Sequence, residues 1–229
     1  MLINIYKITN ILSRLNIGIP ETSWKEEIVR FLTESTSERV VEIPLVFKNI
    51  PSPRKKILDV GCRYSMLSVQ LASLGHDVHG IDINNYKHTH PNFIFHKGDI
   101  LNPNFNKNYF DVVIALSTIE HIGLGRYGDR EDVEGDIKAV RQILGIIKPG
   151  GQLLITLPFG KAVKTNWFRV YNMEKIRKLL TGFKITNKYF FKEKNRSWVP
   201  TVVGDAEKID SSKKPMAVIF VKAIKAIKG

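Results

Sequence analysis

The sequence contains almost no cysteine and no long apolar run. Among its 229 residues Cys62 is the single cysteine, which excludes an internal disulfide framework and a cysteine-based zinc cluster. No apolar stretch approaches the roughly 20 residues that a transmembrane helix requires. The first 20 residues alternate apolar and polar side chains and lack the continuous apolar core of a signal peptide. We therefore expect a cytoplasmic protein with no transmembrane segment.

Acidic residues are scarce in the last third of the chain. Residues 1–160 carry 18 Lys and Arg against 17 Asp and Glu, whereas residues 161–229 carry 17 against 5. A basic region of this kind can attract phosphorylated substrates, nucleic acid or a membrane surface. A solvated lysine-rich surface accounts for the same composition equally well.

Apolar runs alternate with stretches of helical periodicity from residue 56 onward. The periodicity predicts helices over 64–75 and 133–147 and a helix capped by Asn172, and it predicts seven strands at 56–60, 77–83, 92–100, 109–117, 152–159, 185–191 and 216–224. Alternating strands and helices are typical of parallel sheets. No helix is predicted between the last two strands, so we expect them to form an antiparallel edge. The predicted fold is α/β, with a doubly wound, Rossmann-like, mostly parallel seven-stranded sheet.

The first 50 residues do not share this alternation. Ser23 and Glu26 have the spacing of a capping box for a helix that reaches about Glu34. We predict an N-terminal helical cap segment over 1–50, beside the carboxyl edge of the sheet, and one domain over 51–229.

Acidic residues follow the first three predicted strands. Asp59 lies beside Gly61 in a tight turn, Asp82 comes 23 residues later, and Asp99 ends the third strand. Ligands of doubly wound sheets bind at the carboxyl ends of the strands, and an acidic residue about 20 residues after the first turn holds a ribose. A dinucleotide requires G-x-G-x-x-G, but Arg63 and Ser65 follow Gly61 here. A nucleoside cofactor without phosphates fits better.

Five segments resemble the ordered motifs of class I S-adenosylmethionine-dependent methyltransferases. They are ILDVGC, GIDI, GDI, FDVVIALSTIEH and IKPGGQLLITLP, within residues 56–160. LSTIEHIGLGRYGD also resembles a little-characterised branch of that superfamily, which is often considered alongside glycan-modifying enzymes.

The resemblance implies S-adenosylmethionine as the cofactor and a role for each matching residue. Asp59, Gly61 and Cys62 would line the methionine end, Asp82 would hold the ribose, Asp99 the adenine amino group, Ile83 and Ile100 would sandwich the ring, and Ser117 would lie beside the methyl group. The family usually has further glycines at the positions of Arg63 and Ser65. Arg63 would either narrow the pocket or bind the cofactor's carboxylate.

His121, after the fourth strand, is the candidate catalytic residue. A neutral imidazole there could accept the proton of a substrate hydroxyl, although a supporting hydrogen bond in the loop is the competing interpretation. Basic and aromatic residues after the fourth and fifth strands are candidate substrate contacts. Some lie in a loop over 123–130 that could act as a lid, and the others lie in the segment that follows residue 160. These candidates are Arg126, Tyr127, Arg130, Lys161, Trp167 and Arg169. We expect no metal site, because His88 and His90 have no acidic or cysteine neighbour.

These features together predict a methyltransferase that methylates a hydroxyl of a small-molecule or glycan-type acceptor, with an anionic group on the acceptor compatible with the arginines. One alternative is an RNA methyltransferase, for which the basic residues 161–229 are the argument. Another is a cofactor-binding scaffold without catalysis.

Overall fold

The computed structural model describes residues 37–50 and 54–227. Residues from Ser37 onward form one compact unit. The predicted helix from Ser23 to Glu34 and most of the predicted cap segment lie outside the described residues. Within the described part of the chain, no helix has the length and apolar character needed to cross a membrane.

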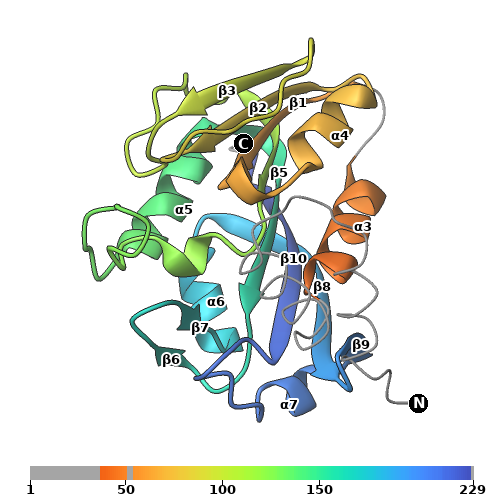
Figure 1. Cartoon of the computed structure of the whole chain (residues 1–229), viewed down its shortest axis with the longest axis vertical. Coiled ribbons are helices and arrows are strands. Elements are labelled where there is room, and N and C mark those ends of the chain that lie inside the picture. The colour runs from red at the N-terminus through yellow and green to blue at the C-terminus, as the bar shows by residue number, and fades with distance from the viewer. Residues whose placement is uncertain (1–36, 51–53, 228–229) are drawn as a thin grey trace, which may run out of the picture. The chain divides into compact units, whose positions relative to one another are not determined.

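The core is an eight-stranded sheet with the strand order β3-β2-β1-β4-β5-β10-β8-β9 (Figure 1). The first five strands in this order are parallel, β10 is antiparallel to both β5 and β8, and β9 is antiparallel to β8. Their bounds are β1 Lys56–Val60, β2 Asp77–Asp82, β3 Phe93–Lys97, β4 Phe110–Ala115, β5 Ile147–Pro158, β8 Phe183–Lys194, β9 Ser197–Thr201 and β10 Ala217–Lys225. The mostly parallel α/β sheet and the antiparallel pairing of the last predicted strands are confirmed.

The predicted number of seven strands is wrong, because β9 is an additional edge strand. It follows β8 through Asn195 and Arg196, which have φ values of 52° and 62°. Two consecutive residues with positive φ form the tight turn that joins the strands of a β-hairpin. Such turns are usually marked by glycine, which this one lacks, so the sequence pattern indicated only a polar loop.

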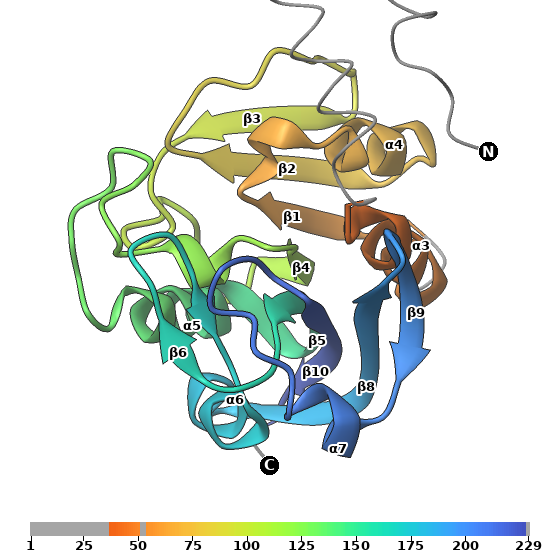
Figure 2. The same ribbon diagram turned by 60° about the horizontal axis from the view of Figure 1, so that its bottom comes forward.

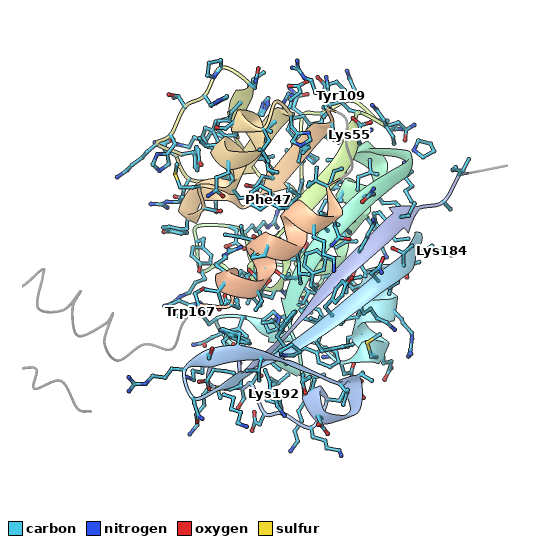
Figure 3. All side chains as sticks on the ribbon, turned by 90° about the vertical axis from the view of Figure 1, so that its right-hand side faces the viewer. Phe47, Lys55, Tyr109, Trp167, Lys184 and Lys192 are labelled. Carbon is cyan, nitrogen blue, oxygen red and sulfur yellow. The ribbon has the colours of Figure 1, made fainter. Side chains whose placement is uncertain are left out.

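Helices cover both faces of the sheet (Figure 2). On one face α3 (Arg39–Asn49) and α4 (Leu67–Ser73) contribute Val46, Leu67 and Leu71 to an apolar cluster. On the other face α5 (Gly135–Ile146) and α6 (Met173–Leu179) pack Ile143 and Ile176 against the strands. In Figure 3 α3 lies across the strands of its face, with Phe47 labelled on it.

Short elements connect the strand ends. They are the 3-10 helices η1 (Cys62–Tyr64) and η2 (Ile119–His121), the two-stranded sheet of β6 (Val163–Lys164) and β7 (Arg169–Val170), and α7 (Val203–Ala206). The predicted cap of α6 is confirmed, since the Asn172 side chain accepts a hydrogen bond from the Lys175 backbone N–H at 2.9 Å. η1 and η2 follow β1 and β4 directly, so both lie at the carboxyl edge of the parallel strands.

Candidate cofactor and acceptor pocket

A cavity of about 280 Å³ opens at the carboxyl ends of the parallel strands. This volume is near the lower end of the range for small-molecule sites, about 300–1,000 Å³. Its lining comes from the ends of β1 to β5, from η1 and η2, from the start of α3 and from β10. The residues are Glu38, Arg39, Val60, Gly61, Arg63, Tyr64, Ile81, Asp82, Ile83, Asn84, Gly98, Asp99, Ile100, Ser117, Thr118, Glu120, His121, Ile122, Tyr127, Asp129, Pro158, Phe168, Pro215 and Val218.

The turn after β1 requires glycine at position 61. Gly61 has φ 73°, in the left-handed region that side chains disfavour. A Cβ atom on Gly61 would lie 2.5 Å from side-chain atoms of Thr118, which itself lines the pocket. The Gly61 N–H donates to the Ile81 carbonyl at 2.9 Å, which joins the ends of β1 and β2. Glycine at this position thus allows the Thr118 side chain to pack directly against the turn.

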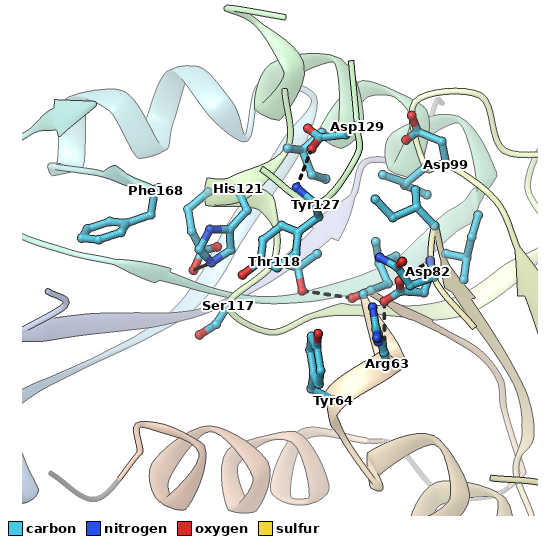
Figure 4. A pocket seen from close by; sticks show the side chains of 18 of the residues that line it. Arg63, Tyr64, Asp82, Asp99, Ser117, Thr118, His121, Tyr127, Asp129 and Phe168 are labelled. Carbon is cyan, nitrogen blue, oxygen red and sulfur yellow. Dashed lines mark hydrogen bonds and ion pairs between the residues drawn. The ribbon is translucent and has the colours of Figure 1, made fainter. Parts of the chain in front are cut away.

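The carboxylates of Asp82 and Asp99 are held by backbone donors. Asp82 Oδ2 accepts from the Arg63 N–H at 3.1 Å, and its Oδ1 accepts from the Asn84 N–H at 2.8 Å. Asp99 Oδ1 accepts from the Leu101 N–H at 2.8 Å. A carboxylate has about four lone-pair positions, so both groups retain capacity to bind hydroxyl or amino donors of a ligand. In Figure 4 these two residues lie on the same side of the pocket.

Asp59 and Cys62 lie beneath the pocket and do not line it. Asp59 is 3% exposed and accepts a hydrogen bond from the Ser68 hydroxyl at 2.6 Å. Burial raises the pKa of Asp59 to about 6, although the Ser68 hydroxyl opposes this shift. Burial likewise raises the pKa of the Cys62 thiol, which therefore stays protonated at neutral pH.

Arg63 and Ser65, which replace the family's glycines, have different surroundings. Arg63 lines the pocket, and its guanidinium carbon lies 4.8 Å from the centroid of the Tyr64 ring (Figure 4). The Ser65 hydroxyl accepts from the Leu67 N–H at 3.0 Å and so satisfies a free donor at the start of α4. Ser65 thus has a structural role outside the pocket.

Ser117 has a strained backbone at the centre of the pocket. Its φ is 43°, which is uncommon for a residue other than glycine. The Ser117 N–H donates to Thr156 Oγ1 at 2.9 Å, and its hydroxyl donates to Glu42 Oε1 of α3 at 2.7 Å. Left-handed backbone conformations of this kind concentrate at ligand sites.

The buried acid Glu120 and the partly buried His121 follow one another after β4. Glu120 is 2% exposed, and its Oε2 has no hydrogen-bond partner among the described residues. Burial raises the Glu120 pKa well above the usual range, and the nearby Glu42 adds to this. His121 Nδ1 lies 2.7 Å from the Trp167 carbonyl oxygen, and His121 Nε2 lies 3.8 Å from Glu120 Oε1. Burial lowers the pKa of His121.

Of the candidate substrate residues, one lines the pocket and the others do not. Tyr127 lines the pocket, with its ring perpendicular to that of His121 at 5.5 Å between centroids. Arg126 lies outside the lining and stacks on Trp167, 3.6 Å from the ring centroid. Arg130, Lys161, Trp167 and Arg169 are also absent from the lining.

Arg169 holds the loop after η2. It is 6% exposed, and its guanidinium donates to the backbone carbonyls of Glu120, Ile122, Asp132 and Val133. Its Nε also lies 3.7 Å from Asp136 Oδ2. Asp129 orders the same loop, since its carboxylate accepts from the backbone N–H groups of Gly123 and Tyr127. The side-chain donors of Arg169 are thus directed at the protein.

Sequence reasoning missed several lining residues. Glu38 and Arg39 come from α3, far from any motif, and Arg39 forms an ion pair with Glu42 at 3.2 Å. Glu120 was visible only as the neighbour of His121. Phe168 and Val218 reach the pocket from segments whose sequence gives no functional signal.

Comparisons with known proteins bear on this fold and site. A family described as "Caenorhabditis protein of unknown function, DUF268" matches residues 83–219, which is more than half of the chain. The chain belongs to this family. The match begins directly after Asp82 and includes η2 and the loop that follows it. A search of curated proteins found no match.

Solved structures with a similar fold include several methyltransferases. An S-adenosylmethionine-dependent methyltransferase from Methanosarcina mazei has a TM-score of 0.58 and 16% identity, over 80% of this chain and 98% of that one. The N-methyltransferase NodS from Bradyrhizobium japonicum, bound to S-adenosylhomocysteine, has a TM-score of 0.58 and 15% identity, over 85% of this chain and 90% of that one. The [4+2]-cyclase SpnF has a TM-score of 0.58 and 16% identity, over 81% of each chain. This chain therefore has the class I methyltransferase fold, which also supports other reactions.

Proposed function

We propose that the protein is an S-adenosylmethionine-dependent methyltransferase that methylates a hydroxyl group of a small-molecule or glycan-type acceptor. The observation that carries the proposal is the Asp82 carboxylate, oriented by two backbone donors and lining the pocket with spare lone pairs. Such a carboxylate binds a ribose diol by accepting from both hydroxyls. Asp99 in the same pocket would accept from the adenine amino group, and Ile83 and Ile100 would pack against the ring.

The residues present fit the methionine end of this cofactor. Gly61 lines the pocket with backbone alone, so it has no side chain that could obstruct a ligand. Arg63 lines the pocket and supplies a guanidinium for the α-carboxylate. When bound, the cofactor supplies an electrophilic methyl group on a sulfonium.

His121 is the proposed proton acceptor. The Trp167 carbonyl can only accept a hydrogen bond, so Nδ1 must carry the proton and Nε2 presents a lone pair. Because burial lowers the pKa of His121, the imidazole is neutral at neutral pH. General bases typically accelerate a reaction about 10²–10⁴-fold. Orientation of the acceptor by the neighbouring residues contributes in addition.

The charge of the pocket disfavours an anionic acceptor. Outside the proposed cofactor contacts the lining carries Glu38, Glu120 and Asp129 against Arg39, and none of the lysines that the structure describes belongs to it. The lysines of residues 161–227 are thus elsewhere on the protein; Lys184 and Lys192, for example, lie on β8 (Figure 3). We therefore do not extend the proposal to RNA.

Calorimetric titration with S-adenosylmethionine and S-adenosylhomocysteine tests the proposal. Asp82→Ala should weaken both affinities about 100-fold, because hydrogen bonds to a charged group contribute about 1.5–3 kcal/mol each. Asp205→Ala, an exposed change on α7, is the matched control and should have no effect. Failure of the unaltered protein to bind either ligand, or equal binding by Asp82→Ala, would disprove the cofactor assignment.

A further inference from the structure

Glu120 is a buried carboxyl group with an unused oxygen at the wall of the pocket. It is 2% exposed, and Oε2 has no partner among the described residues. A buried polar atom without a partner costs about 1–3 kcal/mol. In a ligand pocket, such an atom is satisfied when the ligand donates to it.

The position of Glu120 associates it with the acceptor and not with the cofactor. Asp82 and Asp99 follow β2 and β3, whereas Glu120 and His121 follow β4, the next strand on the opposite side of β1. In Figure 4 His121 and Phe168 lie on one side of Thr118, and Asp82 and Asp99 lie on the other. The acceptor side also contains Tyr127, a residue that is 39% exposed and whose ring suits the apolar face of a sugar or another ring.

We propose that Glu120 and His121 together recognise two adjacent hydroxyl groups of the acceptor, so that the substrate class is a vicinal diol. This inference rests on the proposed function. One hydroxyl donates to His121 Nε2 and is methylated, while its neighbour donates to the Glu120 carboxyl. The two side chains lie close enough for this, since His121 Nε2 is 3.8 Å from Oε1, the other oxygen of the carboxyl group that carries the unpartnered Oε2.

The electrostatics of the pair favour hydroxyl donors over charged groups. Burial and the neighbouring Glu42 both raise the pKa of Glu120, so its protonated form is favoured. A neutral carboxyl still accepts a hydrogen bond through its carbonyl oxygen. An uncharged hydroxyl satisfies it without leaving an ionised group buried, which would be more costly.

The proton balance follows from the geometry. The first hydroxyl transfers its proton to His121 Nε2 as its oxygen forms the bond to the methyl carbon. The bond between that carbon and sulfur breaks, and its electron pair remains on sulfur, which becomes a neutral thioether. The second hydroxyl keeps its proton and its hydrogen bond to Glu120. The imidazolium then releases its proton to solvent.

Three six-membered-ring probes that differ in one group test this inference. They are cyclohexanol, trans-cyclohexane-1,2-diol and trans-2-aminocyclohexanol, titrated by ligand-observed NMR against the protein with and without saturating S-adenosylhomocysteine. The diol should bind about tenfold more tightly than cyclohexanol, which corresponds to one added hydrogen bond to a buried group. Glu120→Leu should abolish the difference, and Glu120→Gln, whose amide oxygen still accepts, should retain most of it. Glu174→Gln, an exposed change on α6, is the control and should leave it intact.

The outcomes separate this inference from the proposed function. Equal affinity for the diol and cyclohexanol in the unaltered protein would overturn the inference without any variant. A preference for the amino alcohol that Glu120→Gln removes would also overturn it, in favour of an ammonium ligand. Weaker S-adenosylhomocysteine binding by Glu120→Gln would reassign Glu120 to the cofactor. Failure of the unaltered protein to bind S-adenosylhomocysteine would count against the proposed function, whereas the diol preference is measured independently.

Discussion

The two halves of the pocket satisfy their polar groups in different ways. In the cofactor half, the carboxylates of Asp82 and Asp99 accept hydrogen bonds from backbone N–H groups within the same turn or the adjacent one. In the acceptor half, Glu120 is buried with one oxygen unpaired, and His121 depends on the carbonyl of Trp167, 46 residues away. One half is formed locally by strand ends, while the other is assembled from distant segments.

This difference has a consequence for stability. The backbone N–H groups that bind Asp82 and Asp99 are placed by the strand ends, so these hydrogen bonds form whenever the strands fold. The acceptor half instead needs contacts between segments, and these must offset the cost of burying ionisable groups. Substitutions should therefore affect the two halves differently.

The largest effect is expected for Arg169→Met. The change removes the guanidinium group from four backbone carbonyls and from Asp136, although the Asp132 carbonyl keeps the Gly135 N–H as a donor and Asp136 Oδ2 keeps the Tyr171 hydroxyl. Removing one partner of a buried ion pair typically costs about 3–5 kcal/mol. Urea denaturation should show a loss of this size, with Arg177→Met on the exposed side of α6 as the control. At low temperature, binding of S-adenosylhomocysteine should change much less. If Arg169→Met weakened the binding of S-adenosylhomocysteine as strongly as it lowered the free energy of unfolding, the two halves would not differ in how they are stabilised.

The same distinction explains how much could be predicted from the sequence. Asp82 and Asp99 were predictable because each follows an apolar strand at a characteristic spacing, and the sheet places such positions together. Glu38, Arg39 and Phe168 were not, because tertiary packing alone brings α3 and the segment before β7 to the pocket. Arg169 was predicted as a substrate contact because it follows the fifth strand in the sequence. Its hydrogen bonds to buried backbone carbonyls depend on tertiary structure, so the sequence could not reveal them.

Asp59→Asn should have an intermediate effect, because Asp59 is a buried ionisable group within the cofactor half. Its pKa of about 6 in the folded protein lies above the unfolded value, so the folded state is penalised once the group ionises. The penalty is absent at low pH, grows as the pH rises between the two pKa values, and is complete above the folded one. Asparagine can still accept from Ser68 and should therefore stabilise the protein by about 3 kcal/mol near pH 8.

Thermal denaturation at two pH values measures this effect. The two proteins should differ near pH 8 and converge at a pH below the unfolded pKa of the carboxyl group. Asp205→Asn, an exposed change on α7, should follow the unaltered protein at both. Lower stability of Asp59→Asn near pH 8 would contradict the prediction, and it would mean that the ionised Asp59 stabilises the folded protein.

The smallest expected effect is a change in titration at His121, which needs no acceptor to be known. Burial lowers its pKa, while the Trp167 carbonyl opposes the shift by favouring the protonated ring. The imidazole should thus gain its second proton at a lower pH than free histidine, and the neutral ring should carry its proton on Nδ1. Nitrogen-15 NMR of the ring, with the signal assigned by its loss in His121→Gln, measures both properties. A neutral ring with the proton on Nε2 would exclude His121 as the base, because Nε2 would then be a hydrogen-bond donor and could not accept a proton. The acceptor half would then have to activate a hydroxyl by orientation alone.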